Sequence, residues 1–548
     1  QEGRNSAPYL RLETLEYTER TTETFQFHGR HKLFDLNFGF ENIFTLGEVE
    51  LDWTLAHSTA DLYQPDKRLF GTAWIGPQYK PGISIPFLGI NTPDRVEDPI
   101  HGPYKPGSDF TLGNLQRVWK EINEESNQKM LNVKVPFEQW SGDEGYFKFG
   151  WFEDITEREY DQESFSNFSS PLLGYSGGSW SGPWEEYWSA EFPNQEHPIT
   201  AYDGDVDYDG YQEINAWYYM FDAPLTSWFT VVAGARYENT KLTIENYPDT
   251  DEDGNVTATW IDVGSSSRVQ VVPGAKYDDD PQGPDVEFWQ EDTLPSIGFV
   301  FEPTDQFTFR GSYTETVARQ TFKELSPIIQ ADYLGGDVFI GNPDLKMSDL
   351  KNYDLRFDWK PYEGGLFSVA WFKKDVINPI EYVQGNIGFN YTYPVNYPEG
   401  TLDGYEFEIR QQMGRLWEDL SGLTLGGNVT LINSEVTLSE DESAIFSDPE
   451  QPLGGRFPEY KRDMTNAPEH LYNIYMMYNL SEWGLSGTDL ALFYTVRGDT
   501  LVAGSGQSGG HYIPSVYETE YGTLNFSLSH KLGETWTLKF QAKNLLDP

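Results

Sequence analysis

Residues 352–360 read Asn352-Tyr353-Asp354-Leu355-Arg356-Phe357-Asp358-Trp359-Lys360, with polar and apolar side chains in strict alternation. A period of two places the two sets on opposite faces of a β-strand. The alternation therefore predicts a strand with one apolar and one charged face. The same pattern recurs at residues 229–237, 404–410, 471–480, 523–529 and 535–543.

The length and the residue types of these strands distinguish a membrane barrel from a soluble antiparallel sandwich. Ordinary strands have about 5–6 residues, whereas several here keep the pattern for about 9–12, the length of a tilted membrane strand. The apolar faces are rich in Tyr, Trp and Phe near the strand ends, as in the aromatic girdles of membrane barrels. The opposite faces carry whole charges, which suit a wet lumen and not a packed core. We expect the lumen-facing set to include Arg356, Asp358, Glu406, Glu408 and Arg410.

The connections between the predicted strands fall into two classes of length. Short polar turns lie at residues 141–145, 302–306, 361–365, 482–487 and 532–534, and long connections alternate with them. Short turns on one side and long loops on the other are typical of outer-membrane barrels. The pattern predicts about eight hairpins and hence about sixteen strands. The long connections lie roughly at residues 62–128, 156–211, 247–291, 318–350, 378–401, 438–468 and 499–519.

Composition supports this prediction and excludes other classes. The chain has 548 residues, no cysteine and a formal net charge of −49, with 34 Tyr, 35 Phe and 17 Trp. So many aromatic residues argue against disorder, and no apolar run is long enough for a membrane helix. The acidity disfavours nucleic-acid binding. We expect most of the negative charge to lie in the long loops, including residues 203–209 and 278–291.

Four stretches resemble the TonB-dependent outer-membrane receptors. Residues 312–327 resemble the strand-to-loop segment of that family, and residues 341–346 with 352–354 resemble its GNPxLKPE…NYDLG signature. Residues 372–377 match its FYKDIKDFI strand, and residues 543–548 resemble its NLLD motif. Together, in the family's order, they cover residues 300–548 and imply an all-β transmembrane antiparallel barrel in the bacterial outer membrane.

The resemblance also implies parts that these 548 residues do not show. Family members carry an N-terminal plug with a TonB box, followed by a barrel of 22 strands that continues past the NLLD motif. We therefore expect residues 1–548 to form an incomplete barrel domain, about 16 of 22 strands. The implied partners are outer-membrane lipid and lipopolysaccharide, a small-molecule substrate, the TonB–ExbB–ExbD complex acting through the plug, and a surface lipoprotein or other outer-membrane protein. In the family, charges that face the lumen hydrogen-bond the plug.

Two Asp-x-Asp-x-Asp-Gly stretches are candidate calcium sites. Alternate carboxylates before a glycine turn can converge on Ca²⁺. Neither stretch has the glutamate expected at position 12, where Ala216 and Trp260 stand, so a solvated acidic loop remains the alternative. No other cofactor is expected. The six candidate ligands are Asp205, Asp207, Asp209, Asp249, Asp251 and Asp253.

Residues 175–188 form the most aromatic of the predicted loops. Aromatic faces beside carboxylates can stack on sugar rings, although they can equally pack against neighbouring loops. The candidate substrate contacts are Trp180, Trp184, Tyr187 and Trp188. No nucleophile elbow, P-loop or HExxH motif is present, so an enzyme is not expected. Two functions stay open: TonB-dependent uptake of an oligosaccharide or ferric siderophore, and a passive porin-like or structural surface barrel.

Overall fold

The fold is known from a computed structural model. It describes residues 9–36, 39–40, 44–75, 84–85, 90–91, 100–103, 115–140, 142–166, 200–201, 206–248, 258–263, 267–273, 285–326, 329–331, 338–386, 390–447, 459–508 and 511–546.

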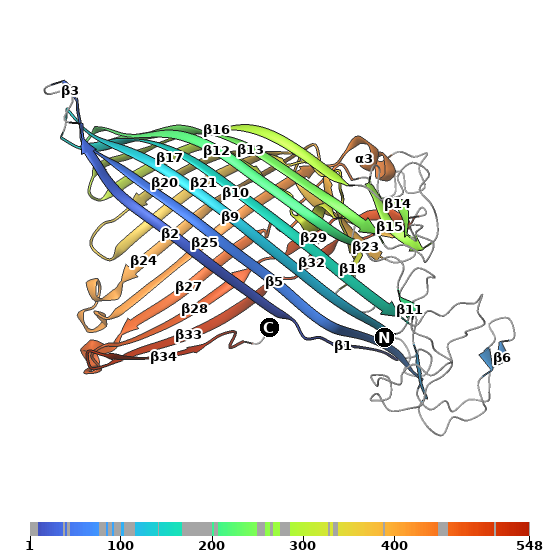
Figure 1. Cartoon of the computed structure of the whole chain (residues 1–548). Helices are drawn as coiled ribbons and strands as arrows, with labels where there is room; N and C mark the ends of the chain where they lie inside the picture. Colours follow the sequence, from blue (N-terminus) through green and yellow to red (C-terminus); the bar gives the residue numbers. More distant parts are fainter. Residues whose placement is uncertain are drawn as a thin grey trace.

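An antiparallel sheet of 22 strand segments dominates the molecule (Figure 1). Six segments are short, and the sixteen long strands follow one another in chain order, each paired with the next. The predicted number and antiparallel order of the strands are therefore confirmed. The long strands are β2 (Glu19–Asp35), β5 (Glu48–Ile75), β9 (Leu115–Gln139), β10 (Glu144–Ser166), β12 (Val206–Thr226), β13 (Phe229–Pro248), β16 (Val286–Thr304), β17 (Phe307–Ala318), β20 (Ser348–Trp359), β21 (Gly365–Ile377), β24 (Glu399–Gln412), β25 (Leu423–Thr437), β27 (His470–Asn479), β28 (Thr488–Arg497), β33 (Tyr521–Leu532) and β34 (Trp536–Ala542).

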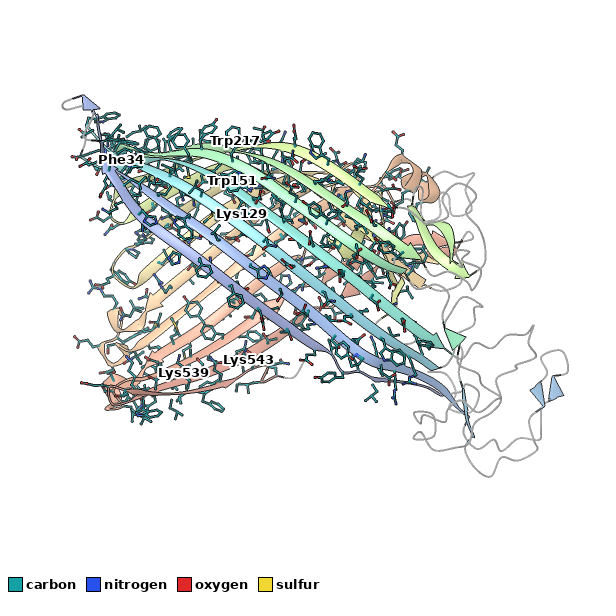
Figure 2. All side chains as sticks on the ribbon, viewed as in Figure 1. Phe34, Lys129, Trp151, Trp217, Lys539 and Lys543 are labelled. Carbon is teal, nitrogen blue, oxygen red and sulfur yellow. The ribbon has the colours of Figure 1, made fainter. Side chains whose placement is uncertain are left out.

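The sheet curves into a barrel wall with β2 and β34 at its two margins (Figure 1). β2 pairs with β5, and β34 pairs with β33. Within the described residues, no pairing joins β2 to β34. Short turns lie at one end of the wall, and Phe34 marks that end in Figure 2.

The outward face of the wall carries the apolar set of each alternating strand. Trp151 and Trp217, on neighbouring strands, are directly paired and project outward (Figure 2). Exposed aromatic residues also gather near the short turns, so two aromatic margins border an apolar band, as a bilayer requires. The margin near the turns includes Trp140, Trp228, Trp359, Trp483 and Trp536, and the other includes Trp151, Trp217 and Tyr405.

Six neighbouring strands, from β5 to β16, are longer than the sequence pattern predicts. They span 19 to 28 residues, where the alternation predicted about 9–12. Above the apolar band the outward positions become polar, so the pattern of outward apolar residues ends although the strand pairing continues. In β10, for example, Glu157, Glu159, Asp161 and Glu163 are exposed while the residues between them are partly or fully buried. We call this projecting part the tall wall.

Much of the predicted loop charge therefore lies on strands. Residues 206–209 and 286–291 belong to β12 and β16 and not to loops. The longer strands also occupy both ends of the predicted connections 62–128 and 156–211.

Several of the long connections contain folded elements at the end opposite the short turns (Figure 1). A second sheet joins β18 (Ile329–Ala331), β19 (Val338–Ile340), β23 (Asn390–Asn396) and β22 (Ile380–Asn386). The helices α2 (Phe322–Leu325) and α3 (Glu440–Ser447) lie in the same region. We call these elements the cap, together with the other described residues between β17 and β20, β21 and β24, β25 and β27, and β28 and β33. Among the described residues, no helix is long and apolar enough to cross a membrane.

Candidate functional site: the barrel mouth and its inner wall

The chain leaves the wall at the end of β17 and turns toward the inner face of β13. Arg319 forms an ion pair with Glu238, and its Nε donates to Thr240 Oγ1 at 3.3 Å. Both partners alternate with the outward residues of β13, so they face the lumen. This anchor directs the following helix toward the inner face of the tall wall.

A capping box begins helix α2. The Glu324 backbone N–H donates to Thr321 Oγ1, and the Thr321 N–H donates to the Glu324 carboxylate at 2.7 Å. These two bonds satisfy donors that a helix start leaves free. The Thr321-x-x-Glu324 spacing was a readable signal that the sequence prediction missed.

Helix α2 packs against the inner face of the tall wall. Phe322 and Leu325 are buried, and the ring of Phe322 fills the space that the missing side chain of Gly210 leaves open. Burying two large apolar side chains contributes about 3–6 kcal/mol to this contact. The tall wall supplies Tyr160, Tyr208, Leu242, Ile244 and Val286 to the same cluster, and the cap adds Leu345.

Residues 341–343, which read Gly-Asn-Pro, form hydrogen bonds that link two elements of the cap. The Asn342 backbone N–H donates to the Glu324 carbonyl at 2.6 Å, and its side chain donates to the Pro394 carbonyl at 3.0 Å. A Cβ at Gly341 would lie 1.9 Å from the Ser326 carbonyl oxygen, so only glycine permits this approach. The motif thus joins α2 to β23.

A buried arginine links three connections of the cap. Arg462 donates to the Tyr397 hydroxyl, lies 3.4 Å from a Glu442 carboxylate oxygen, and donates to the Ser505 carbonyl at 3.2 Å. Burial raises the pKa of the Glu442 carboxyl, although the Arg462 guanidinium acts in the opposite direction. The three contacts come from chain segments far apart, which explains why no sequence pattern indicated them.

A second buried carboxyl lies nearby on β22. Glu381 is 1% exposed and accepts a bond from the Thr465 backbone N–H at 2.6 Å. Burial raises the pKa of Glu381 to about 7, while the Thr465 bond partly opposes the shift. The cap therefore contains a carboxyl that gains and loses its proton near neutral pH.

Three of the five predicted lumen charges form one hydrogen-bonded cluster on the wall. Arg356 lies 2.7 Å from Asp358 and 2.9 Å from Glu408. Asp358 also pairs with Arg310 and accepts from Ser368 at 2.5 Å. The side chain of Asp358 is 4% exposed, so the ionised carboxylate depends on these partners.

Glu406 and Arg410 occupy alternate positions with Glu408 on the same face of β24. Both are exposed, and within the described residues neither forms an ion pair. Their contact with a plug stays a prediction.

The candidate calcium ligands are only partly described. Asp207 and Asp209 lie in β12, where they accept from the Gln162 N–H at 2.9 Å and the Tyr247 hydroxyl at 3.1 Å. Gly210 continues the strand, so the expected glycine turn is wrong there. Among the described residues, no cluster of three or more acidic or histidine side chains could hold a metal ion. Asp205, Asp249, Asp251 and Asp253 lie outside the described residues.

The aromatic loop lies entirely outside the part of the chain that the structure describes. This applies to Trp180, Trp184, Tyr187 and Trp188, so their contact with a substrate stays a prediction.

Comparison with known proteins identifies the family of this chain. A family model described as TonB dependent receptor-like, beta-barrel matches residues 52–545, and no curated protein matches. The ferric yersiniabactin uptake receptor FyuA from Yersinia pestis is 10% identical, with 100% of this chain and 71% of that chain covered and a TM-score of 0.46. The siderophore receptor PiuA from Acinetobacter baumannii is 10% identical, with 98% and 77% covered and a TM-score of 0.42. The ferripyoverdine receptor of Pseudomonas aeruginosa is 12% identical, with 98% and 64% covered and a TM-score of 0.48.

Proposed function

Because this outer-membrane chain belongs to the family of TonB-dependent receptor β-barrels, we propose that the protein takes up a scarce nutrient actively, through a cap that restricts the mouth. The supporting observation is the packing of α2 and Leu345 against the inner face of the tall wall. A passive channel needs an unobstructed mouth, whereas a folded cap favours capture followed by a driven step. The energy would come from TonB–ExbB–ExbD acting through the expected plug.

An oligosaccharide is the substrate class that the lumen favours. Hydroxyl-rich solutes bind through many neutral hydrogen bonds, and one stretch of the inner wall consists of amide and hydroxyl side chains. The Asn473 amide donates to Asn428 at 2.9 Å, and Thr495 donates to Asn473 at 2.6 Å. The predicted aromatic loop suits stacking on sugar rings. Neither feature calls for a metal in the substrate or for catalytic chemistry.

Uptake by the full-length protein tests this proposal. In cells, the protein should accumulate labelled oligosaccharides of a matching class, and deleting TonB should abolish accumulation. A deletion strain should lose growth on those oligosaccharides and keep growth on ferric siderophores. Loss of growth on ferric siderophores alone would indicate that the substrate is a siderophore and not an oligosaccharide. Uptake that persists without TonB would favour a passive barrel.

A further inference from the structure

The barrel wall splits between β16 and β17. The two strands pair from Thr304 and Phe307 as far as Ser296 and Thr314. Pro295 follows, and proline has no backbone N–H to continue the ladder. β17 stays with β20 until Ala318 pairs with Ser348, and the chain then turns inward at Arg319.

The split exposes the edge of β16 over residues 286–295. The Glu302 N–H donates to the Trp228 carbonyl at 2.7 Å, so the even-numbered residues of β16 bond to β13. The N–H and C=O groups of Glu287, Trp289, Glu291 and Thr293 therefore point away from β13. Within the described part of the chain, no strand pairs with these groups. An open strand edge of this kind accepts an added strand.

A cleft of about 490 Å³ lies along this edge. Its polar lining is mainly acidic, and burial together with the Asp292 and Glu315 carboxylates raises the pKa of Asp349. The side chain of Trp289 is 60% exposed on the same strand and offers an apolar anchor. The charged and amide residues that line the cleft are Asp285, Glu287, Gln290, Asp344, Lys346, Asp349 and Asn378.

We propose that residues 286–295 of β16 form a docking edge for an extended, basic segment of a second protein, which adds to the sheet as a strand. The unpaired backbone groups supply the main-chain bonds, and the carboxylates of the cleft select a positively charged segment. A second copy of this chain is a poor occupant, because each copy carries a formal net charge of −49. The proposal does not rest on the proposed uptake, because its test measures peptide binding and not transport.

Peptide binding to the purified, detergent-solubilised protein tests the proposal. The probe is a fluorescein-labelled ten-residue peptide of alternating Lys and Val, with a Glu and Val peptide as its charge-reversed control. We expect fluorescence anisotropy to show binding of the basic peptide only. A ¹³C-carbonyl label in the peptide should report β-strand formation on binding by infrared spectroscopy.

Two variants at one position separate strand addition from simple charge attraction. Glu291→Pro removes an edge N–H that does not bond β13, whereas Glu291→Ala keeps that N–H and removes the same carboxylate. We expect Glu291→Pro to weaken binding of the basic peptide at least tenfold and Glu291→Ala by about threefold or less. Thr293→Pro repeats the backbone test if Glu291→Pro does not fold.

Three results would each overturn the proposal. The first is no binding of the basic peptide to the unaltered protein. The second is equal weakening by Glu291→Pro and Glu291→Ala, which would mean charge attraction without strand addition. The third is equal binding of the basic and acidic peptides, which would remove charge selection by the cleft.

Discussion

The ring of Phe322 lies so close to Gly210 that a Cβ at position 210 would come within 2.6 Å of Phe322 Cε1. A methyl group there must displace the ring, and overpacking of this kind costs about 1–3 kcal/mol. We therefore expect Gly210→Ala to speed hydrogen exchange of the amides at residues 322–326 roughly 5- to 150-fold, while β13 stays protected.

The double variant Gly210→Ala/Phe322→Ala is the control for this contact. It removes the ring that clashes, so adding the methyl group to a Phe322→Ala background should have little further effect on exchange. An equal effect of Gly210→Ala in both backgrounds would show that the ring is not its cause.

Asp358 holds two arginines on the inner wall, and replacing it should destabilise the barrel. Asp358→Ala leaves Arg310 and Arg356 without their shared carboxylate. Because the two arginine side chains are 44% and 35% exposed, losing these charged hydrogen bonds should cost about 1–3 kcal/mol. The midpoint of thermal unfolding in detergent should be lower than that of the unaltered protein. Glu406→Gln is the matched control, because Glu406 shares the strand face but is exposed, and it should change stability by no more than about 0.5 kcal/mol. Equal midpoints for the two variants would contradict the role of the cluster.

Arg462 should hold the connections of the cap together. Arg462→Met removes the guanidinium from Tyr397, Glu442 and Ser505 and leaves the Glu442 carboxyl buried without its cation. We expect proteolysis of residues 380–397 and 499–508 to speed up while the barrel remains intact. Adding Glu442→Gln should restore part of the protection, because the uncompensated charge is then gone. If the double variant is cleaved as fast as the single one, charge compensation is not what holds the cap.

The cap should become less stable as the pH rises. Burial raises the pKa of Glu381 from its ordinary 4.5 to about 7, so between those values the unfolded segment binds fewer protons than the folded one. The free energy of opening therefore falls across this window, by on the order of 3 kcal/mol. The backbone N–H of Gln384 donates to the Gly504 carbonyl at 2.9 Å. Its protection against hydrogen exchange therefore reports the opening of the cap.

Glu381→Gln carries no titrating group, so its protection should stay flat across the same pH range and exceed that of the unaltered protein at pH 8. Glu435→Gln, at a half-exposed side chain, should leave the original pH dependence in place. A pH dependence that survives in Glu381→Gln would assign the effect to another group.

The alternation in the sequence correctly predicted which residues of a strand face outward and which face the lumen. It did not predict contacts that form only when distant segments pack together. Leu355 and Trp359 face outward and Arg356 and Asp358 form the opposite cluster, because a period of two fixes the faces of a strand. The extra length of the tall wall was missed, because above the apolar band the outward positions become polar and the pattern of outward apolar residues ends there. The cluster around Arg462 was missed, because its members meet only after distant connections fold together.

The acidic strand faces of the tall wall also affect which solutes reach the mouth of the barrel. On β10, Glu157, Glu159, Asp161 and Glu163 are exposed at every second position, about 7 Å apart, which is less than the Debye length of about 8 Å at physiological salt. Neighbouring charges therefore reinforce one another and gather a layer of mobile counterions. Anionic solutes are repelled on that flank before they reach the cap, whereas neutral and cationic solutes approach freely. Discrimination by charge thus begins outside the lumen, in the diffuse ionic layer around the tall wall.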